Sequence, residues 1–597
     1  MTDEIRKSRP DKHTHVDQLH KHTFTSPAGD VIPHPALDIP VEEKAYTRNY
    51  GLDKVVFGVT AAIAVGFLIW GFVNTKSLAT ASTSALNWVM EDLGWLFVLT
   101  ASGFVVFVIW LAMSRYGNIP LGRDDEEPEF RTVSWIAMMF SAGMGIGLMF
   151  FGVSEPLSHF ASPPPGTGGE GNAEAAQIAM ATTMFHWTLH PWAIYAVVGL
   201  AIAYGVYRKG RLQLVSAAFE PLLGSRVKGP AGKVIDMLAI FATLFGSAAS
   251  LGLGALQIRS GLQIVTGIGQ IGNAVLICII AVLTACFVLS AVSGVSKGIQ
   301  WLSNTNMVLA LAMALFIFLV GPTMFMLNMI PTSIGSYVDQ LATMAARTGA
   351  EGPAVSDWLQ DWTIFYWAWW ISWTPFVGMF IARISRGRTI RQFVAGVLLV
   401  PSVVSVVWFC VFGGAAIFEQ QNGVDLAGMG SQEQQLFSLL GEYPIATVTS
   451  IVVMLLVAIF FVSGADAASI VMGSLSERGT ISPSRATVIF WGVATGAVGA
   501  VMLLVGGEDA LNGLQSITII VAVPFVLVMV GLAVALVRDL RHDPLVVRRE
   551  YAEVAVNDAV VAGVIQHGDD FVLAVERDPG ADDAEESVEP DVERTTG

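Results

Sequence analysis

Residues 362–380 read WTIFYWAWWISWTPFVGMF, an uncharged segment long enough to cross a bilayer as a helix. Five of the sixteen tryptophans of the chain fall within twelve of these residues. Six aromatic residues of the segment recur at steps of three and four, which places them on one face of a helix. They are Trp362, Tyr366, Trp369, Trp373, Phe376 and Phe380. The segment therefore predicts a membrane-spanning helix with an aromatic face.

The composition of the whole chain points to the same class of protein. Of 597 residues, 53% are apolar and 14% are charged, whereas soluble proteins average roughly 25% charged residues. Because lipid offers no partner to exposed backbone amides, the spans must be helices, and we predict an all-α polytopic membrane protein. No basic face for nucleic acid is present. The sequence also lacks a nucleophile–base pair, a metal-ligand set or a cofactor loop, so we expect neither an enzyme nor a bound cofactor.

Twelve apolar stretches are long enough to span the hydrocarbon core. They are 54–75, 93–114, 133–153, 176–206, 235–258, 273–295, 305–329, 362–382, 392–417, 445–473, 486–506 and 514–537. If the N-terminus starts inside, 30 of the 33 Lys and Arg residues fall on the inner side and only Lys76, Arg259 and Arg347 on the outer side. We therefore expect both termini in the cytoplasm, with a polar tail over 1–53 and an acidic tail over 539–597.

The span 133–153 contains alternate glycines at Gly143, Gly145 and Gly147, each of which weakens a helix by about 1 kcal/mol relative to Ala. Two interpretations remain open. The glycines could permit close helix packing, or the helix could unwind at mid-membrane and offer backbone groups to a ligand or ion.

A second unusual segment, FHWTLHPWAIY at 185–195, combines aromatic residues with Pro191, which interrupts a helix. His186 and His190 are spaced like zinc ligands, but no acid or cysteine joins them in the sequence, so hydrogen bonding or packing is the favoured interpretation. Glu155 and Asp466 are ionisable residues within or next to spans and are functional candidates for that reason.

The tryptophan-rich span has two possible roles. A wall of indole faces suits an alkylated ammonium ligand, because cation–π contact contributes about 2 kcal/mol per ring once desolvated. Pure packing is the alternative. Hydroxyl groups at Thr243, Ser247, Ser250 and Ser463 suit a hard cation, although helical Ser and Thr also bond to their own backbone.

The motifs MMFSAGMGIGLMFFG, TTMFHWTLHPWAIY and WTIFYWAWWISWTPFVGMFIARISRGR closely resemble the betaine/choline/carnitine transporter family, in particular the sodium-coupled glycine betaine carriers of actinobacteria. The resemblance runs from about 129 to 537 and implies a leucine-transporter-like fold. In that fold a twelve-helix transporter domain, here 54–538, consists of two leading helices over 54–114 and two inverted five-helix repeats over 133–329 and 362–537. Discontinuous helices would head both repeats. The resemblance further implies a homotrimer that works by alternating access in the bacterial inner membrane, surrounded by lipid.

The resemblance also implies a substrate site, a gating aromatic residue at Phe150, and backbone dipoles of Gly143, Gly145 and Gly147 that face a substrate carboxylate. The implied aromatic box and its pathway consist of Trp187, Trp192, Tyr195, Trp369, Trp370 and Trp373, and Ser250 is a further candidate at the site. Choline carriers of the family place an acid at the position of Gly147, so glycine here favours a zwitterionic betaine.

Two sodium sites are implied as well. One uses Ser141, Met144, Phe460, Ser463 and Gly464, and the other uses Thr243, Ser247 and Phe376. Relatives carry a hydroxyl at the position of Gly464, so one side-chain ligand is lost here. We expect a symporter that couples sodium entry to the uptake of a zwitterionic compatible solute, with glycine betaine first and ectoine or proline next. The alternatives are a sodium-independent exchanger of the carnitine type and a membrane osmosensor.

Overall fold

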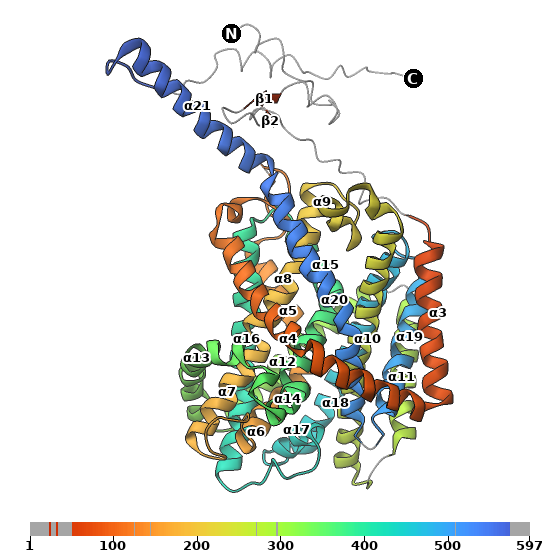
Figure 1. Cartoon of the computed structure of the whole chain (residues 1–597). Helices are drawn as coiled ribbons and strands as arrows, with labels where there is room; N and C mark the ends of the chain where they lie inside the picture. The colour runs from red at the N-terminus through yellow and green to blue at the C-terminus, as the bar shows by residue number, and fades with distance from the viewer. Residues whose placement is uncertain are drawn as a thin grey trace, which may run out of the picture. The chain divides into compact units, whose positions relative to one another are not determined.

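The structure is a computed structural model, shown in Figure 1. Its residue contacts divide the chain into two compact units. One unit comprises Met1–Pro40 with Arg541–Gly597, and the other comprises Val41–Leu540. The residues that the structure describes are 23–25, 31–33, 50–124, 126–143, 145–269, 272–293, 296–507 and 509–573.

The unit formed by the two chain ends contains three regular elements in its described residues. Strand β1 (Thr23–Thr25) pairs antiparallel with β2 (Val31–Pro33). Helix α21 (Pro544–His567) begins after Asp543, whose side chain accepts a hydrogen bond from the Leu545 amide. Such a cap satisfies one of the free amides at a helix start. The C-terminal region that the sequence predicts as an acidic tail therefore includes a helix.

The larger unit opens with two apolar helices, α3 (Lys54–Val73) and α4 (Thr75–Met113). Asp53 caps the first by accepting hydrogen bonds from two backbone amides. Asn74 ends α3 and caps α4 through its side chain, so one polar residue separates two helices that would otherwise be continuous.

The glycine-rich span is interrupted, which agrees with the second of the two interpretations that its alternate glycines leave open. Helix α5 (Thr132–Gly143) ends before Met144, and α6 (Ile146–Ala161) begins after Gly145, which adopts an extended backbone with φ −166° and ψ −178°. Gly145 has no side chain to cap α6. The free amides at the start of α6 therefore remain available to another partner.

A second interruption follows at Thr188, between α7 (Ala173–Trp187) and α8 (Leu189–Ala203). Pro191 is the cause, because it has no N–H for the carbonyl of Trp187 and its ring collides with that carbonyl in a straight helix. Trp187 thereby lies at the last position of α7, immediately before the bend.

The tryptophan-rich span is continuous, which corrects the expectation of a second discontinuous helix. It forms α15 (Phe365–Ile384), preceded by α14 (Pro353–Leu359) and the π-helical turn η7 (Gln360–Ile364). Pro375 lies inside α15 and cannot bond to the Ile371 carbonyl. The Thr374 hydroxyl donates to that carbonyl at 2.7 Å instead, which replaces the missing bond and lets the helix continue.

The remaining helices of the larger unit complete the bundle. They are α9 (Glu220–Leu223), α10 (Pro230–Thr266), α11 (Asn273–Ser293), α12 (Ser296–Val320), α13 (Thr323–Ala346), α16 (Ile390–Gln421), α17 (Gln432–Gly441), α18 (Ala446–Ser476), α19 (Arg485–Val505) and α20 (Ala510–Arg541). Apart from an isolated bridge between Pro120 and Thr389, regular structure in the described residues of this unit is helical.

Within the described residues, nine helices are long and apolar enough to cross a membrane, or ten if the bent pair α12 and α13 forms one span. The protein is therefore a multi-pass helical membrane protein. The glycine-rich and tryptophan-rich segments are absent from the nine, the first because it is broken and the second because tryptophan is less apolar than leucine. The full set of twelve spans stays a prediction.

Helix α10 lies at the centre of the bundle, where it packs against α15, α18 and α19, and α15 packs in turn against α8. Glycines permit the closest approaches. A side chain at Gly246 would meet Ser372 and Trp373, and one at Gly254 would meet Ile146 and Val457. These contacts bring the broken helix, the tryptophan helix and α18 together around α10.

Candidate functional site

The first two members of the predicted aromatic box meet at the bend after α7. Trp187 and Trp370 of α15 are both about 95% buried, with exposures of 6% and 5%, and their ring centroids lie 4.9 Å apart with planes at 75°. The rings face the interior of the bundle, where they are shielded from lipid. Because they touch edge to face, a ligand between them requires the rings to separate.

Two further members extend this contact along α8. Tyr195 lies 6.3 Å from Trp370 between ring centroids, and Trp192 lies 5.4 Å from Tyr195. Trp192 and Tyr195 share one face of α8 because they are three residues apart. The four residues that the resemblance assigns to the box are thus connected in the structure.

Trp369 and Trp373 continue the row along α15. Trp369 stacks on Trp370 with a centroid distance of 4.6 Å and an interplanar angle of 16°, and Trp373 lies 6.2 Å from Trp369. Offset stacking of this kind stabilises aromatic pairs beyond the area that they bury. Trp187, Trp369, Trp370 and Trp373 together form one continuous aromatic wall.

Each indole N–H of this wall donates to an acceptor on another helix. Trp187 donates to Glu155 Oε2 at 2.6 Å, Trp369 to Ser250 Oγ at 3.0 Å, Trp370 to the His186 carbonyl at 3.1 Å, and Trp373 to the Gly246 carbonyl at 3.0 Å. These bonds fix the ring orientations. They also leave the π faces, rather than the N–H groups, as the surface that a ligand can contact.

Phe150 is fully buried, and its ring lies 4.7 Å from the neighbouring Phe151. It is Phe151 whose ring faces the cluster, at 6.1 Å from both Trp187 and Trp369 and 5.3 Å from Tyr366. The sequence analysis missed Phe151 and Tyr366 as members of the site. Helical phase could have suggested Tyr366, which lies four residues before Trp370.

Gly147 lies between the indole rings of Trp187 and Trp369. A Cβ atom there would be 2.6 Å from Trp369 and 2.8 Å from Trp187, closer than real contacts allow. A Cβ at Gly145 would meet nothing within 4 Å. Gly143 ends α5, so the three glycines lie at the helix break but serve different steric needs.

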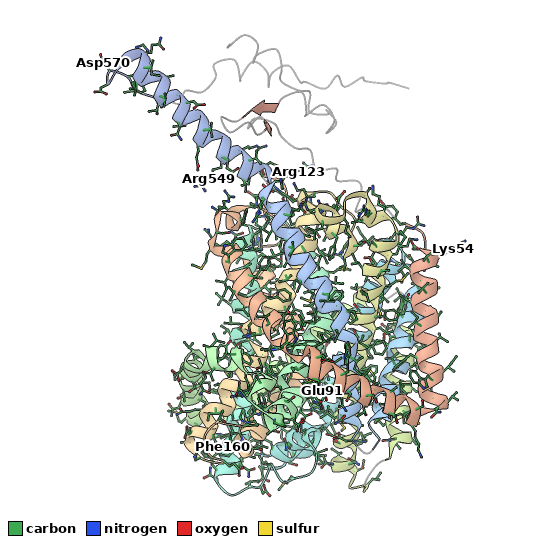
Figure 2. All side chains as sticks on the ribbon, viewed as in Figure 1. Lys54, Glu91, Arg123, Phe160, Arg549 and Asp570 are labelled. Carbon is green, nitrogen blue, oxygen red and sulfur yellow. The ribbon has the colours of Figure 1, made fainter. Side chains whose placement is uncertain are left out.

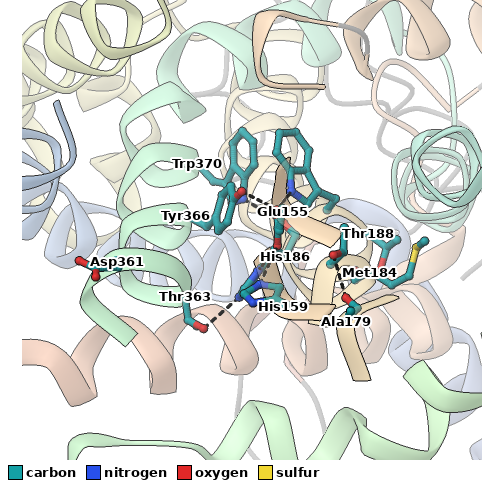
Figure 3. A network of polar contacts seen from close by, with 12 residues as sticks. Glu155, His159, Ala179, Met184, His186, Thr188, Asp361, Thr363, Tyr366 and Trp370 are labelled. Atoms are coloured by element: carbon teal, nitrogen blue, oxygen red, sulfur yellow. Dashed lines mark hydrogen bonds and ion pairs between the residues drawn. The ribbon is translucent and has the colours of Figure 1, made fainter. Parts of the chain in front are cut away.

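Beneath the rings lies a buried polar network centred on Glu155, shown in Figure 3. Its carboxylate is fully buried and accepts hydrogen bonds from Trp187 and Tyr366 on Oε2, while Oε1 lies 2.6 Å from His186 Nδ1. His186 Nε2 is 2.9 Å from the Thr363 hydroxyl. The network thus links α6 and α7 to η7 and α15.

This network corrects one step of the sequence analysis, which found no acid beside His186 and His190. Glu155 joins His186 from 31 residues upstream. His190 remains apart from it: its ring stacks on Trp367 at 4.9 Å, and its Nε2 lies 3.4 Å from Ser102. The expected hydrogen bonding or packing therefore describes both histidines: His186 is hydrogen-bonded to Glu155 and Thr363, and His190 packs on Trp367.

The hydroxyls of the second predicted sodium site lie on α10. Thr243 and Ser247 are buried and one turn apart, and Thr243 donates to the Ala239 carbonyl at 2.8 Å. Ser372 and Trp373 of α15 lie against Gly246 of α10. Phe376 follows one helical turn after Ser372. The predicted ligands consequently lie on two helices that touch at this level.

The first predicted sodium site includes residues of α18. Ser463 donates to the carbonyl of Ile459 at 2.9 Å, and Phe460 and Ser463 share one face. A Cβ at Gly464 would meet nothing within 4 Å. Met144 lies outside the described residues, and for Ser141 the structure describes only its helical backbone in α5.

A family comparison accounts for this arrangement. The family model described as BCCT, betaine/carnitine/choline family transporter, matches residues 55–545. The chain belongs to this family. It is a transporter rather than an enzyme, and the resemblance inferred from its motifs is confirmed.

Several curated relatives match this BCCT transporter over most of both chains. The betaine/ectoine transporter LcoP of Corynebacterium glutamicum is 47% identical over 91% of this chain and 86% of its own. The glycine betaine transporter OpuD of Bacillus subtilis is 45% identical over 82% and 94%. Glycine betaine transporter 1 of Vibrio parahaemolyticus is 41% identical over 83% and 95%.

Proposed function

We propose that this BCCT transporter is a sodium-coupled symporter that takes up a zwitterionic compatible solute, with glycine betaine preferred and ectoine or proline next. It would work by alternating access, as a homotrimer, in the bacterial inner membrane with both termini in the cytoplasm. Charge supports this orientation, since Lys54 and Arg123 lie at one end of the larger unit and Phe160, next to a predicted outer loop, lies at the other (Figure 2).

The observation that carries the substrate class is the buried indole wall with satisfied N–H groups. Trp187 and Trp370 offer π faces but no free hydrogen-bond donor. Such a surface suits a quaternary ammonium group, which carries no N–H and is held by cation–π attraction. The relatives LcoP, a betaine/ectoine transporter, and OpuD, a glycine betaine transporter, support this choice.

The start of α6 supports a substrate that also carries a carboxylate. Gly145 at the N-cap position has no side chain to offer to its first amides, and a helix N-terminus attracts negative charge through free N–H groups and the helix dipole. Gly147 leaves no space for an acidic side chain beside the rings. A cation without a carboxylate, such as choline, would therefore lack a partner at this position.

Sodium coupling would use oxygen ligands, which hard cations prefer. Thr243, Ser247 and Phe376 would form one site between α10 and α15. The second would comprise Ser141, Met144, Phe460, Ser463 and Gly464. Substrate and sodium would each help to order the closed state, a coupling free energy of typically ~1–3 kcal/mol.

The test of coupling is radiolabelled glycine betaine uptake into proteoliposomes with and without an inward sodium gradient. We expect uptake to depend on the gradient. Gly464, which lacks a hydroxyl, is the observation that favours a sodium-independent exchanger. Equal rates with and without the gradient, together with acceleration by internal betaine, would establish that alternative.

The test of the aromatic box is Trp370→Leu in the same uptake assay. Loss of one desolvated cation–π face, about 1.4–2 kcal/mol, should weaken the apparent affinity for betaine roughly tenfold or more. Trp88→Leu is the matched control, because Trp88 is 56% exposed on α4. Equal half-saturation concentrations in both variants would contradict the box.

A further inference from the structure

Three potential metal ligands converge beneath the aromatic wall. Glu155 and His159 are one turn apart on α6, and His186 reaches them from α7. One oxygen of Glu155 and one ring nitrogen from each histidine all lie within 4.8 Å of one another, and all three side chains are at least 99% buried. Figure 3 shows the three side chains directed toward one another.

We propose that this cluster is a binding site for a divalent transition-metal ion of the zinc class. Two imidazole nitrogens with one carboxylate oxygen are a common zinc donor set, with a fourth position left to water. Ligand bonds of about 2.0–2.2 Å require the 2.6 Å Glu155–His186 pair to open by about 1 Å. The metal would replace the proton that this pair shares.

An unsatisfied nitrogen provides an independent observation. Among the described residues, Nε2 of His159 has no hydrogen-bond partner despite its burial, and it lies 3.6 Å from Glu155 Oε1. A buried polar atom without a partner is costly. A bound metal would give this nitrogen a partner while helix α6 stays in place.

The surrounding residues resemble the outer shell of a metal site. Trp187 and Tyr366 bind the second oxygen of Glu155, and the Thr363 hydroxyl lies 2.9 Å from the second nitrogen of His186. Such partners fix the orientation of ligands, and their loss typically weakens metal binding by about 10–100-fold. Glu155 and His186 are therefore oriented by contacts to atoms that would not bind the metal.

A metal at this site would weaken binding of the transport substrate, an inference that rests on the proposed function. One carboxylate and two neutral imidazoles around a doubly charged ion leave a net positive charge. That charge would lie one hydrogen bond from Trp187 and Tyr366, and it would repel an ammonium group at the rings. We expect zinc to raise the half-saturation concentration for betaine.

The binding experiment uses the full chain purified without a histidine tag. Five histidines of the N-terminal region are replaced by Gln in every variant, so that they contribute no zinc to the measurement. They are His13, His15, His20, His22 and His34. After zinc loading and desalting, bound zinc is measured by elemental analysis, and affinity by titration with a chromophoric zinc chelator.

We expect one tightly bound zinc per chain, loss of that zinc in His159→Gln and in His186→Gln, and weakening of about 10–100-fold in Thr363→Val. His190→Gln is the matched control, because His190 is equally buried on the adjacent helix but outside the cluster, and it should retain the zinc. Thermal unfolding of each zinc-free variant shows whether it is folded. Absence of retained zinc in the parent chain, or equal retention in folded His159→Gln, would overturn the site.

Uptake measurements then test the effect of zinc on transport separately from zinc binding. Zinc should raise the half-saturation concentration for betaine in the parent chain but not in His159→Gln. Bound zinc with unchanged uptake would overturn the electrostatic opposition, while the site would stand. A parent chain that carries no betaine at all would contradict the proposed function and leave the zinc measurement unaffected.

Discussion

The aromatic wall and the hydroxyl groups of α10 and α18 are both predicted binding regions, but they are held in different ways. In the wall, the indole N–H groups of Trp187 and Trp370 donate to other helices. In the hydroxyl regions, Thr243 and Ser463 donate to the carbonyl four residues earlier in their own helix. The wall is therefore ordered by contacts between helices, whereas these hydroxyls are ordered within their own helix and keep their oxygen lone pairs for an ion.

This difference teaches where substitutions should matter most. Contacts between helices preorganise a site and make it sensitive to the loss of one partner. A hydroxyl that donates within its own helix keeps its position when a neighbouring helix loses a side chain. We expect large effects around the wall and small effects at the sodium sites.

The largest effect is expected for Glu155→Ala. The change removes the acceptor of Trp187 and Tyr366 and leaves buried donors unsatisfied, at about 1–3 kcal/mol each. The apparent affinity for betaine should fall more than about tenfold, and thermal stability should fall with it. Glu155→Gln keeps one side-chain oxygen as an acceptor and should lose less affinity and less thermal stability. Saturation uptake and thermal unfolding measure both, and wild-type values for the alanine variant would refute the tertiary ordering of the wall.

A smaller effect is expected for Gly147→Ala. The added methyl would press on the rings of Trp369 and Trp187, and overpacking typically costs about 1–3 kcal/mol. We expect roughly a tenfold loss of betaine affinity. Gly145→Ala is the control, because its methyl meets nothing. Comparable losses in the two variants would show that the helix break, rather than ring contact, is responsible.

The smallest effect, and the only gain, is expected for Gly464→Ser. The open space there accommodates a hydroxyl, and one additional polar contact of ~1 kcal/mol would lower the half-saturating sodium concentration about fivefold. Gly464→Ala distinguishes the hydroxyl from the methyl. A serine variant that matches the alanine variant would remove Gly464 from the sodium site.

Much of the fold could be predicted because its signals are local. Long apolar stretches predict spans, and the alternate glycines mark the segment in which α5 ends at Gly143 and α6 begins at Ile146. The second break lies at Thr188, between α7 and α8. Its place follows from Pro191 only if one considers that a proline removes the hydrogen bond to the carbonyl four residues earlier, here that of Trp187. Continuity of α15 depends on the Thr374 hydroxyl, a compensation that composition does not reveal.

The candidate site divides in the same way. Aromatic residues at helical spacing are visible in the sequence, so the row on α15 could be predicted. The Glu155 network could not, because its partners lie 31 and 211 residues away, at His186 and Tyr366. Phe151 rather than Phe150 faces the rings because of the rotation of α6, which depends on where the helix restarts after Gly145.

Helix α4 has a consequence for the lipid environment. Its 39 residues extend about 60 Å at 1.5 Å per residue, roughly twice the thickness of a hydrocarbon core. A helix of this length crosses obliquely, runs partly along the membrane surface or extends beyond the bilayer, and the inclination of its membrane part should follow acyl-chain length. Because α4 packs against α8, which carries Trp192 and Tyr195, changes in bilayer thickness would reach the aromatic wall directly.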